Sequence, residues 1–156
     1  MSSPLRVAAI CLAALSLVAA GCGGDTKKNN DYVDAVNKAQ TDLVSNVQKV
    51  GSGSTTSGSD PAAAAKKTFD DLTGAIDKFI SDLKGVTPPD EVKTLHNDLI
   101  SEVTQVEDEV KSAGSSLDSK NPQTIITAMS KLSTSVSDLE TKMSKTIDDI
   151  NAKLHS

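Results

Sequence analysis

The side chains able to do chemistry are few: two cysteines and two histidines in a chain of 156 residues. Both thiols, Cys11 and Cys22, stand within the first 22 residues. This position excludes disulfides, thiolate metal sites and cysteine nucleophiles from the rest of the chain. His155 is the penultimate residue, where chain ends fray, so His96 is the histidine left for a role inside a folded domain.

His96 is a candidate for binding a ligand or sensing pH, because an imidazole titrates near neutrality. Metal sites inside helical bundles use Glu-x-x-His motifs, and Lys93 stands where such a motif needs Glu. No metal ion is therefore expected. His96 lies beside an apolar stripe that includes Leu95 and Leu99, which favours a boundary residue covering the edge of the core, with ligand binding or pH sensing as the alternative.

The clustered carboxylates favour a solvated surface over a cation site. Residues so close together on a helix point in different directions around it. We expect this of Glu102, Glu107, Asp108 and Glu109, and equally of Asp148 and Asp149.

Motifs for catalysis and cofactors are missing. The serines lack the Gly-x-Ser-x-Gly context of an activated nucleophile. A Cys-x-x-Cys-His haem motif is absent, and the glycine-rich stretch 51–58 has no lysine to bind phosphate. We expect no catalytic residue, no cofactor and no enzymatic activity.

Composition and charge limit which kinds of partner and which kind of core the chain can have. The formal net charge is −5, and no basic cluster is present that could neutralise phosphates, so nucleic acid is not an expected partner. Hydrophobic residues make up 37% of the chain, with two Phe, one Tyr and no Trp. One domain with an aliphatic core, of the kind that suits helices packed side by side, is predicted.

The first residues have the form of an export signal. Met1 to Arg6 carries one positive side chain, and Val7 to Ala20 is an almost unbroken apolar run. The run is shorter than the roughly 20 residues that a membrane-spanning helix needs. We therefore predict a secretory leader that is removed.

The end of this leader, Val18-Ala19-Ala20-Gly21-Cys22, resembles the lipobox of bacterial lipoproteins, with Ala19 where the family usually has Leu. The resemblance implies cleavage between Gly21 and Cys22, acylation of the Cys22 sulfur, and Cys22 as the first mature residue. Two or three acyl chains hold a protein on a membrane durably, since each buried methylene contributes about 0.8 kcal/mol. Residues 1–21 would be the signal peptide, 22–30 a lipidated flexible tether and 31–156 the folded domain.

Apolar residues then recur at spacings of three and four, which predicts amphipathic helices. The first covers residues 31–50, and the Gly/Ser-rich stretch 51–60 is a predicted mobile loop. The second begins at Asp60-Pro61, with Asp60 as N-cap, and ends at Gly85. Thr87 is the expected cap of the third, which opens with Pro88-Pro89-Asp90 and reaches Leu117. Asn121-Pro122 opens the fourth, which reaches Leu154.

Four stripes of similar length, joined mostly by short connections, predict an all-α fold: an antiparallel up-down-up-down four-helix bundle. Its first helix would begin at the tether. The turn at residues 87–89 and the C-terminus would then face the membrane, and the loop 51–60 and the turn near Asp118 would lie at the far end.

The layout as a whole is similar to the small uncharacterised helical lipoproteins common in actinobacteria. The similarity lies in the leader, the Ser/Gly-rich break, and the pattern Leu83-x-x-Val86-x-Pro88-Pro89 running into Leu95-His96. It implies an extracytoplasmic, membrane-attached helical protein and carries no activity with it.

These features together predict a non-enzymatic protein on the outer face of the cell membrane, or at the outer membrane of a cell with two membranes. Acyl chains on Cys22 would bind the membrane, and the helical surface would bind an envelope partner or act as a scaffold. The alternative is a carrier that holds a lipid or another apolar ligand in a groove between helices.

Overall fold

The computed structural model describes residues 26–53, 61–117, 121 and 123–154. These residues form α2 (Thr26–Gly53), α3 (Pro61–Gly85), the short 3-10 helix η1 (Asp90–Val92), α4 (Lys93–Ser115) and α5 (Gln123–Leu154). The all-α prediction is confirmed for this part of the chain. Cys11, Cys22, Asp60 and His155, and the predictions that concern them, lie outside the described residues.

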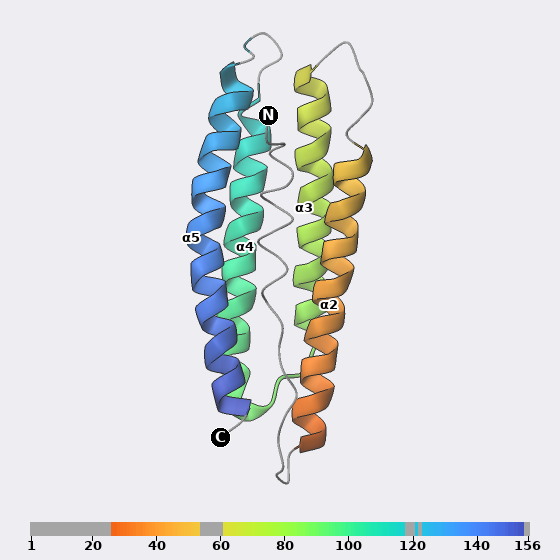
Figure 1. Ribbon diagram of the computed structural model, residues 1–156, viewed down its shortest axis with the longest axis vertical. Helices are drawn as coiled ribbons and strands as arrows, with labels where there is room; N and C mark the ends of the chain where they lie inside the picture. Colours follow the sequence, from red (N-terminus) through yellow and green to blue (C-terminus); the bar gives the residue numbers. More distant parts are fainter. Residues whose placement is uncertain (1–25, 54–60, 118–120, 122, 155–156) are drawn as a thin grey trace.

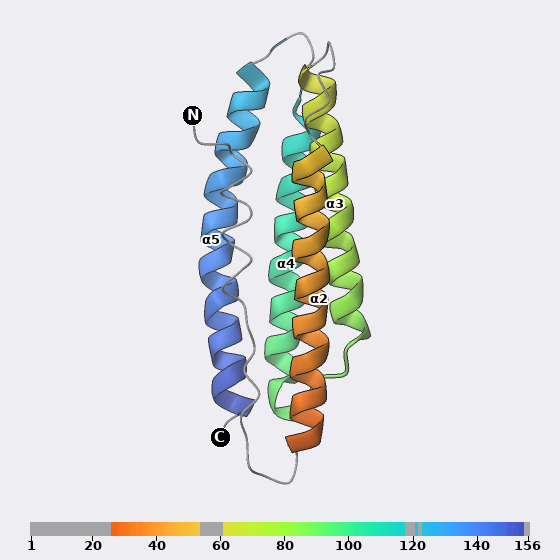
Figure 2. The same cartoon turned by 45° about the vertical axis from the view of Figure 1, so that its right-hand side comes forward.

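The four long helices lie alongside one another (Figure 1). Each packs against the helix that follows it in the chain, and η1 contacts both α4 and α5. Figure 2 agrees with Figure 1 in placing α5 beside α4 and α2 beside α3. None of the described helices is both long enough and apolar enough to cross a bilayer.

Helix α2 extends further than its apolar spacing predicts. It begins at Thr26, inside the stretch predicted as tether, and ends at Gly53, inside the predicted loop. An ion pair between Lys27 and Asp31, one turn apart at 2.6 Å, supports the added first turn. Polar residues without apolar periodicity can therefore still be helical when they continue an established helix.

Lysine four residues before aspartate is a recurring arrangement on the exposed faces, and it accounts for much of the surface charge. Exposed pairs of this kind contribute little to stability, because water and salt screen the attraction. The pairs are Lys27–Asp31, Lys38–Asp42, Lys66–Asp70, Lys67–Asp71, Lys78–Asp82 and Lys145–Asp149.

Helix α3 begins at Pro61 and ends at Gly85, as predicted. The predicted cap of the third helix is wrong. Thr87 is exposed, and Pro89 precedes η1 with an extended backbone (φ −55°, ψ 150°) and no side-chain cap. A residue before proline is pushed out of the helical region, so Thr87 and Pro88 cannot enter the helix and the first turn starts at Asp90.

Helix α5 begins as predicted from Asn121. The Asn121 side-chain Oδ1 accepts the backbone N–H of Gln123 at 3.1 Å, and its backbone carbonyl accepts the N–H of Thr124 at 3.0 Å. These bonds satisfy donors that a helix start otherwise leaves unpaired.

The core is mainly aliphatic, and its three aromatic residues, Tyr32, Phe69 and Phe79, are all buried. Other fully enclosed side chains are Val36, Leu83, Val92, Leu99, Val110 and Ile150. On α4 the buried line passes through His96 and Glu107, while Leu95 and Val106 are only partly buried. At the start of α4, His96 is therefore enclosed in place of Leu95, which the sequence predicts on the apolar stripe.

Gly114 of α4 lies directly against Phe69 of α3. A Cβ built there would lie 2.9 Å from the Cβ of Phe69, whereas one built at Gly74 in α3 would meet nothing within 4 Å. We predict that Gly114→Ala lowers the free energy of unfolding by about 1 kcal/mol, because the cost of overpacking exceeds the gain in helix propensity. Gly74→Ala is the control and should raise it by up to about 1 kcal/mol.

Chemical denaturation of the two variants beside the parent measures both changes. Stabilisation by both substitutions would show that α3 and α4 are further apart than described.

Candidate functional site

His96 lies in the core and not at its boundary, which corrects the sequence prediction. Only 2% of the residue is exposed. The reason is the register of α4, in which Val92, His96, Leu99 and Val103 form the inward line. Leu95 and His96 are neighbours in sequence, so a small rotation of the helix decides which of them is enclosed.

Both ring nitrogens of His96 are hydrogen-bonded to other helices. Nδ1 lies 3.2 Å from the Tyr32 hydroxyl of α2, and Nε2 lies 3.1 Å from the Leu83 carbonyl of α3. A carbonyl oxygen can only accept, so Nε2 carries the proton and donates, and Nδ1 accepts from the Tyr32 O–H. The rings meet edge to face, with centroids 5.6 Å apart and planes at 69°.

The pKa shifts of His96 and Tyr32 favour the neutral form of each side chain. Burial lowers the pKa of His96, opposed in part by the hydrogen bond to Leu83, and burial raises the pKa of Tyr32 to about 12. The phenol is thus protonated and able to donate. Neither ring nitrogen of His96 is free to bind a ligand in this arrangement, so pH sensing is the predicted role that stays open.

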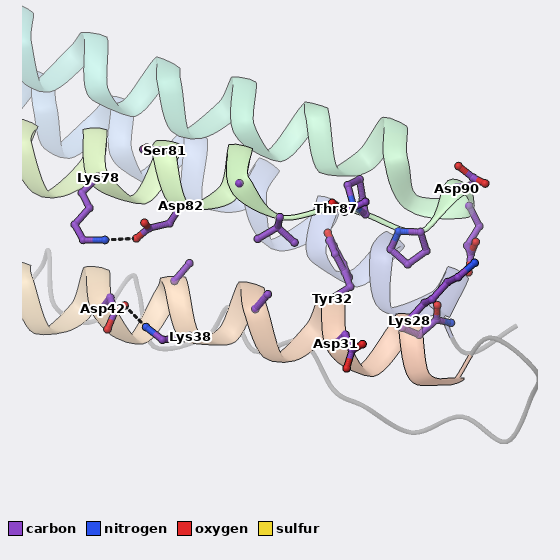
Figure 3. Close-up of a pocket in the computed structure, with 18 residues that line it drawn as sticks. Lys28, Asp31, Tyr32, Lys38, Asp42, Lys78, Ser81, Asp82, Thr87 and Asp90 are labelled. Atoms are coloured by element: carbon purple, nitrogen blue, oxygen red, sulfur yellow. Dashed lines mark hydrogen bonds and ion pairs between the residues drawn. The ribbon is translucent and has the colours of Figure 1, made fainter.

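Tyr32 also lines a groove of about 940 Å³ between α2, the end of α3 and the turn before η1. Its lining includes Ala35, Ala39, Val86, Pro88 and Pro89 as apolar residues. Figure 3 shows Tyr32 reaching from α2 toward this turn. The size falls in the range of ligand sites.

Charged pairs flank the groove on both helices. Lys38–Asp42 on α2 (2.8 Å) lies opposite Lys78–Asp82 on α3 (2.6 Å), as Figure 3 shows. The hydrogen bond from Lys38 lowers the pKa of Asp42, and Lys78 across the groove acts in the same direction. The two pairs therefore form an alternating set of charges that spans the two helices.

An unsatisfied acceptor lies in the same groove. The Oδ1 of Asn29, which is half-buried on α2, is enclosed and has no hydrogen-bond partner among the described residues. Enclosed polar atoms are normally paired, so this oxygen is an exception in the groove wall. Sequence reasoning missed both Tyr32 and this groove; the lone tyrosine beside the stripe at Val33 was the available signal.

Two members of the predicted solvated acidic face are turned inward, which corrects that prediction. Glu107 is buried and paired with Lys111, while Asp108 and Glu109 are exposed as expected. Glu102 is half-buried.

The Oε1 of Glu102 accepts from the Thr146 hydroxyl of α5 at 3.1 Å, whereas its Oε2 is enclosed and finds no partner within the described ranges. Burial is the main cause that raises the pKa of the Glu102 carboxyl.

Asp148 is exposed and the half-buried Asp149 pairs with Lys145. In the part of the chain that the structure describes, no three side chains of His, Cys, Asp or Glu gather to hold a metal ion.

In comparisons with known proteins, no family model, curated protein or solved structure matched this chain.

We predict that Glu102→Gln gains stability over the parent as the pH rises from 4 to 7. The parent carboxyl has a raised pKa in the folded state, so its favourable contribution is complete below its ordinary value of 4.5 and is lost as the pH rises through the folded pKa. A glutamine does not titrate and keeps an oxygen for Thr146.

Denaturant unfolding at several pH values measures the difference, and Glu109→Gln, at an exposed position on the same helix, is the control. A difference for Glu102→Gln that does not change with pH would contradict the assignment.

Proposed function

We propose that this chain is an extracytoplasmic lipoprotein that acts without catalysis, held to the membrane by acyl chains on Cys22 and binding a partner through the groove beside Tyr32. The observation that carries the anchor is the leader ending in Val18-Ala19-Ala20-Gly21-Cys22. Helix α2 begins at Thr26, and four residues span at most about 14 Å. The helices would thus begin close to the bilayer surface.

The proposed arrangement of the helices is an antiparallel up-down-up-down four-helix bundle. The contacts between consecutive helices support it. The hydrogen bonds of His96 also support it, because they connect Tyr32 near the start of α2 with Leu83 near the end of α3. Tight connections such as the turn at residues 86–89 are typical of neighbouring antiparallel helices.

In this arrangement the groove lies at the membrane-proximal end, because its lining runs from Lys28 near the start of α2 to Glu91 in η1. The charged pairs on its sides favour a partner with polar and charged groups. They argue against the alternative of an apolar ligand in this groove, since charged groups lose solvation without gaining a partner there. An envelope protein with a polar, hydrogen-bonding segment fits best.

We predict that Cys22→Ala abolishes acylation and membrane retention, because the thiol of residue 22 is the acceptor of the acyl chains. Intact-mass measurement and fractionation of the chain expressed in a bacterial host test this. Cys11→Ala is the matched control, since it removes the other thiol and should leave the acyl mass on residue 22. An unacylated product in the parent chain would overturn the anchor.

The binding role predicts a specific cross-link from the groove. A photoreactive residue placed at Ser81, exposed beside the groove, should capture a defined partner in intact cells. The same residue at Ser101, an exposed serine of α4 outside the groove lining, is the control. Equal products from the two positions, or none from Ser81, would contradict partner binding at the groove.

A further inference from the structure

We propose that His96 is a proton-sensitive latch: protonation of its ring releases Tyr32 and thereby changes the shape of the groove. This inference concerns the response of the groove to pH and does not depend on which partner binds there. It is carried by the position of His96, which reaches from α4 to two other helices at once.

Two groups hold the His96 ring in place, the Leu83 carbonyl and the Tyr32 hydroxyl. The Leu83 carbonyl accepts from the Val86 N–H at 3.0 Å and from His96 Nε2 at 3.1 Å, so both of its lone pairs are used. The Tyr32 hydroxyl donates to Nδ1 at 3.2 Å. The enclosed neutral ring thus satisfies its partners with one donor and one acceptor.

A proton added to Nδ1 disrupts the hydrogen bond with Tyr32 of α2 and leaves the one with Leu83 of α3 intact. Nε2 still donates to Leu83, but Nδ1–H now meets a hydroxyl whose own proton points toward it. The Tyr32 oxygen can accept only after its proton turns away, and among the described residues His96 is its recorded hydrogen-bond partner. Once it has turned away, that proton has no acceptor among the described residues, and it lies beside a buried positive charge that is costly without a compensating carboxylate.

No charged group among the described residues compensates this charge. Asp31 and Lys84, which adjoin Tyr32 and Leu83 in sequence, are exposed, as are Glu91 of η1 and Lys153 near the end of α5. None of them contributes to the pKa of His96, which is lowered by burial and raised only by the bond to Leu83. Tyr32, with a pKa raised to about 12, does not titrate in the same range.

The released group belongs to the groove wall. Tyr32 lines the groove, and the segment that follows Leu83, from Gly85 to Glu91, lines it from the other side. Loss of the Tyr32–His96 bond frees the phenol to move into or out of the groove. The groove in neutral surroundings therefore differs in shape from the groove in mildly acidic ones.

The chain provides its own reporter, because Tyr32 is its one tyrosine and it has no tryptophan. We expect tyrosine fluorescence of the full chain to show a one-proton transition with a midpoint below 6.5, the ordinary value for histidine. His96→Gln should remove this transition. His155→Gln, which removes the other histidine, is the matched control and should keep it.

Histidine NMR of the parent chain decides the matter even where His96→Gln fails to fold. The ring of His96 should be the Nε2–H tautomer at pH 8 and titrate with the midpoint of the fluorescence change. The amide signals of Val86 and Thr87 should move with it. A transition that persists in His96→Gln, or a His96 midpoint at or above 6.5 in the folded chain, would overturn the latch.

Discussion

A polar ring enclosed among helices must find a partner for each of its nitrogens, and this requirement at His96 fixes much of the surrounding geometry. An aliphatic core attracts without direction, so Leu, Val and Ile side chains tolerate rotation and sliding of one helix on another. Two hydrogen bonds between one imidazole and the helices α2 and α3 do not tolerate such movement, because each needs a fixed distance and direction. They hold Tyr32 of α2 and Leu83 of α3 at fixed positions relative to α4, and Tyr32 is also part of the groove wall.

Other inward polar groups add to this effect along α4. Glu107 pairs with Lys111 at the edge of the core, and Glu102 receives the Thr146 hydroxyl from α5. The pair of Glu107 and Lys111 lies within α4 and does not depend on the register. Enclosed polar contacts contribute little net stability because desolvation offsets the gain, yet a register that separates Glu102 from Thr146 would leave that contact unmade at a cost of about 1–3 kcal/mol. The polar residues of this core therefore select one packing among several that the aliphatic stripes allow.

The sequence predicts the features here that depend on local backbone chemistry. Pro61 at a helix start, Gly85 at a helix end and the Asn121 cap follow from which residues can or cannot donate and adopt helical angles. Thr87 was mistaken for a cap because two successive prolines delay the helix beyond its reach. The inward turn of His96 and Glu107 was missed since a spacing pattern fixes a face only to about one residue, and tertiary contacts decide the rest. The groove could not be predicted, because no single helix contains it. The acylation of Cys22 stays a prediction.

Under the proposed anchoring, the latch and the groove occupy the end of the protein nearest the bilayer. An anionic membrane surface attracts protons as it attracts other cations, within roughly one Debye length of about 8 Å at physiological ionic strength. A titrating group at this end therefore experiences a lower pH than the bulk solution. Burial lowers the pKa of His96, so in neutral bulk solution the ring stays unprotonated and keeps its bond to Tyr32. The lower pH near the membrane surface acts in the opposite direction and favours protonation. The distance between the lipid and the first turn of α2, and not the chemistry of His96 alone, then sets the bulk pH at which the groove changes shape.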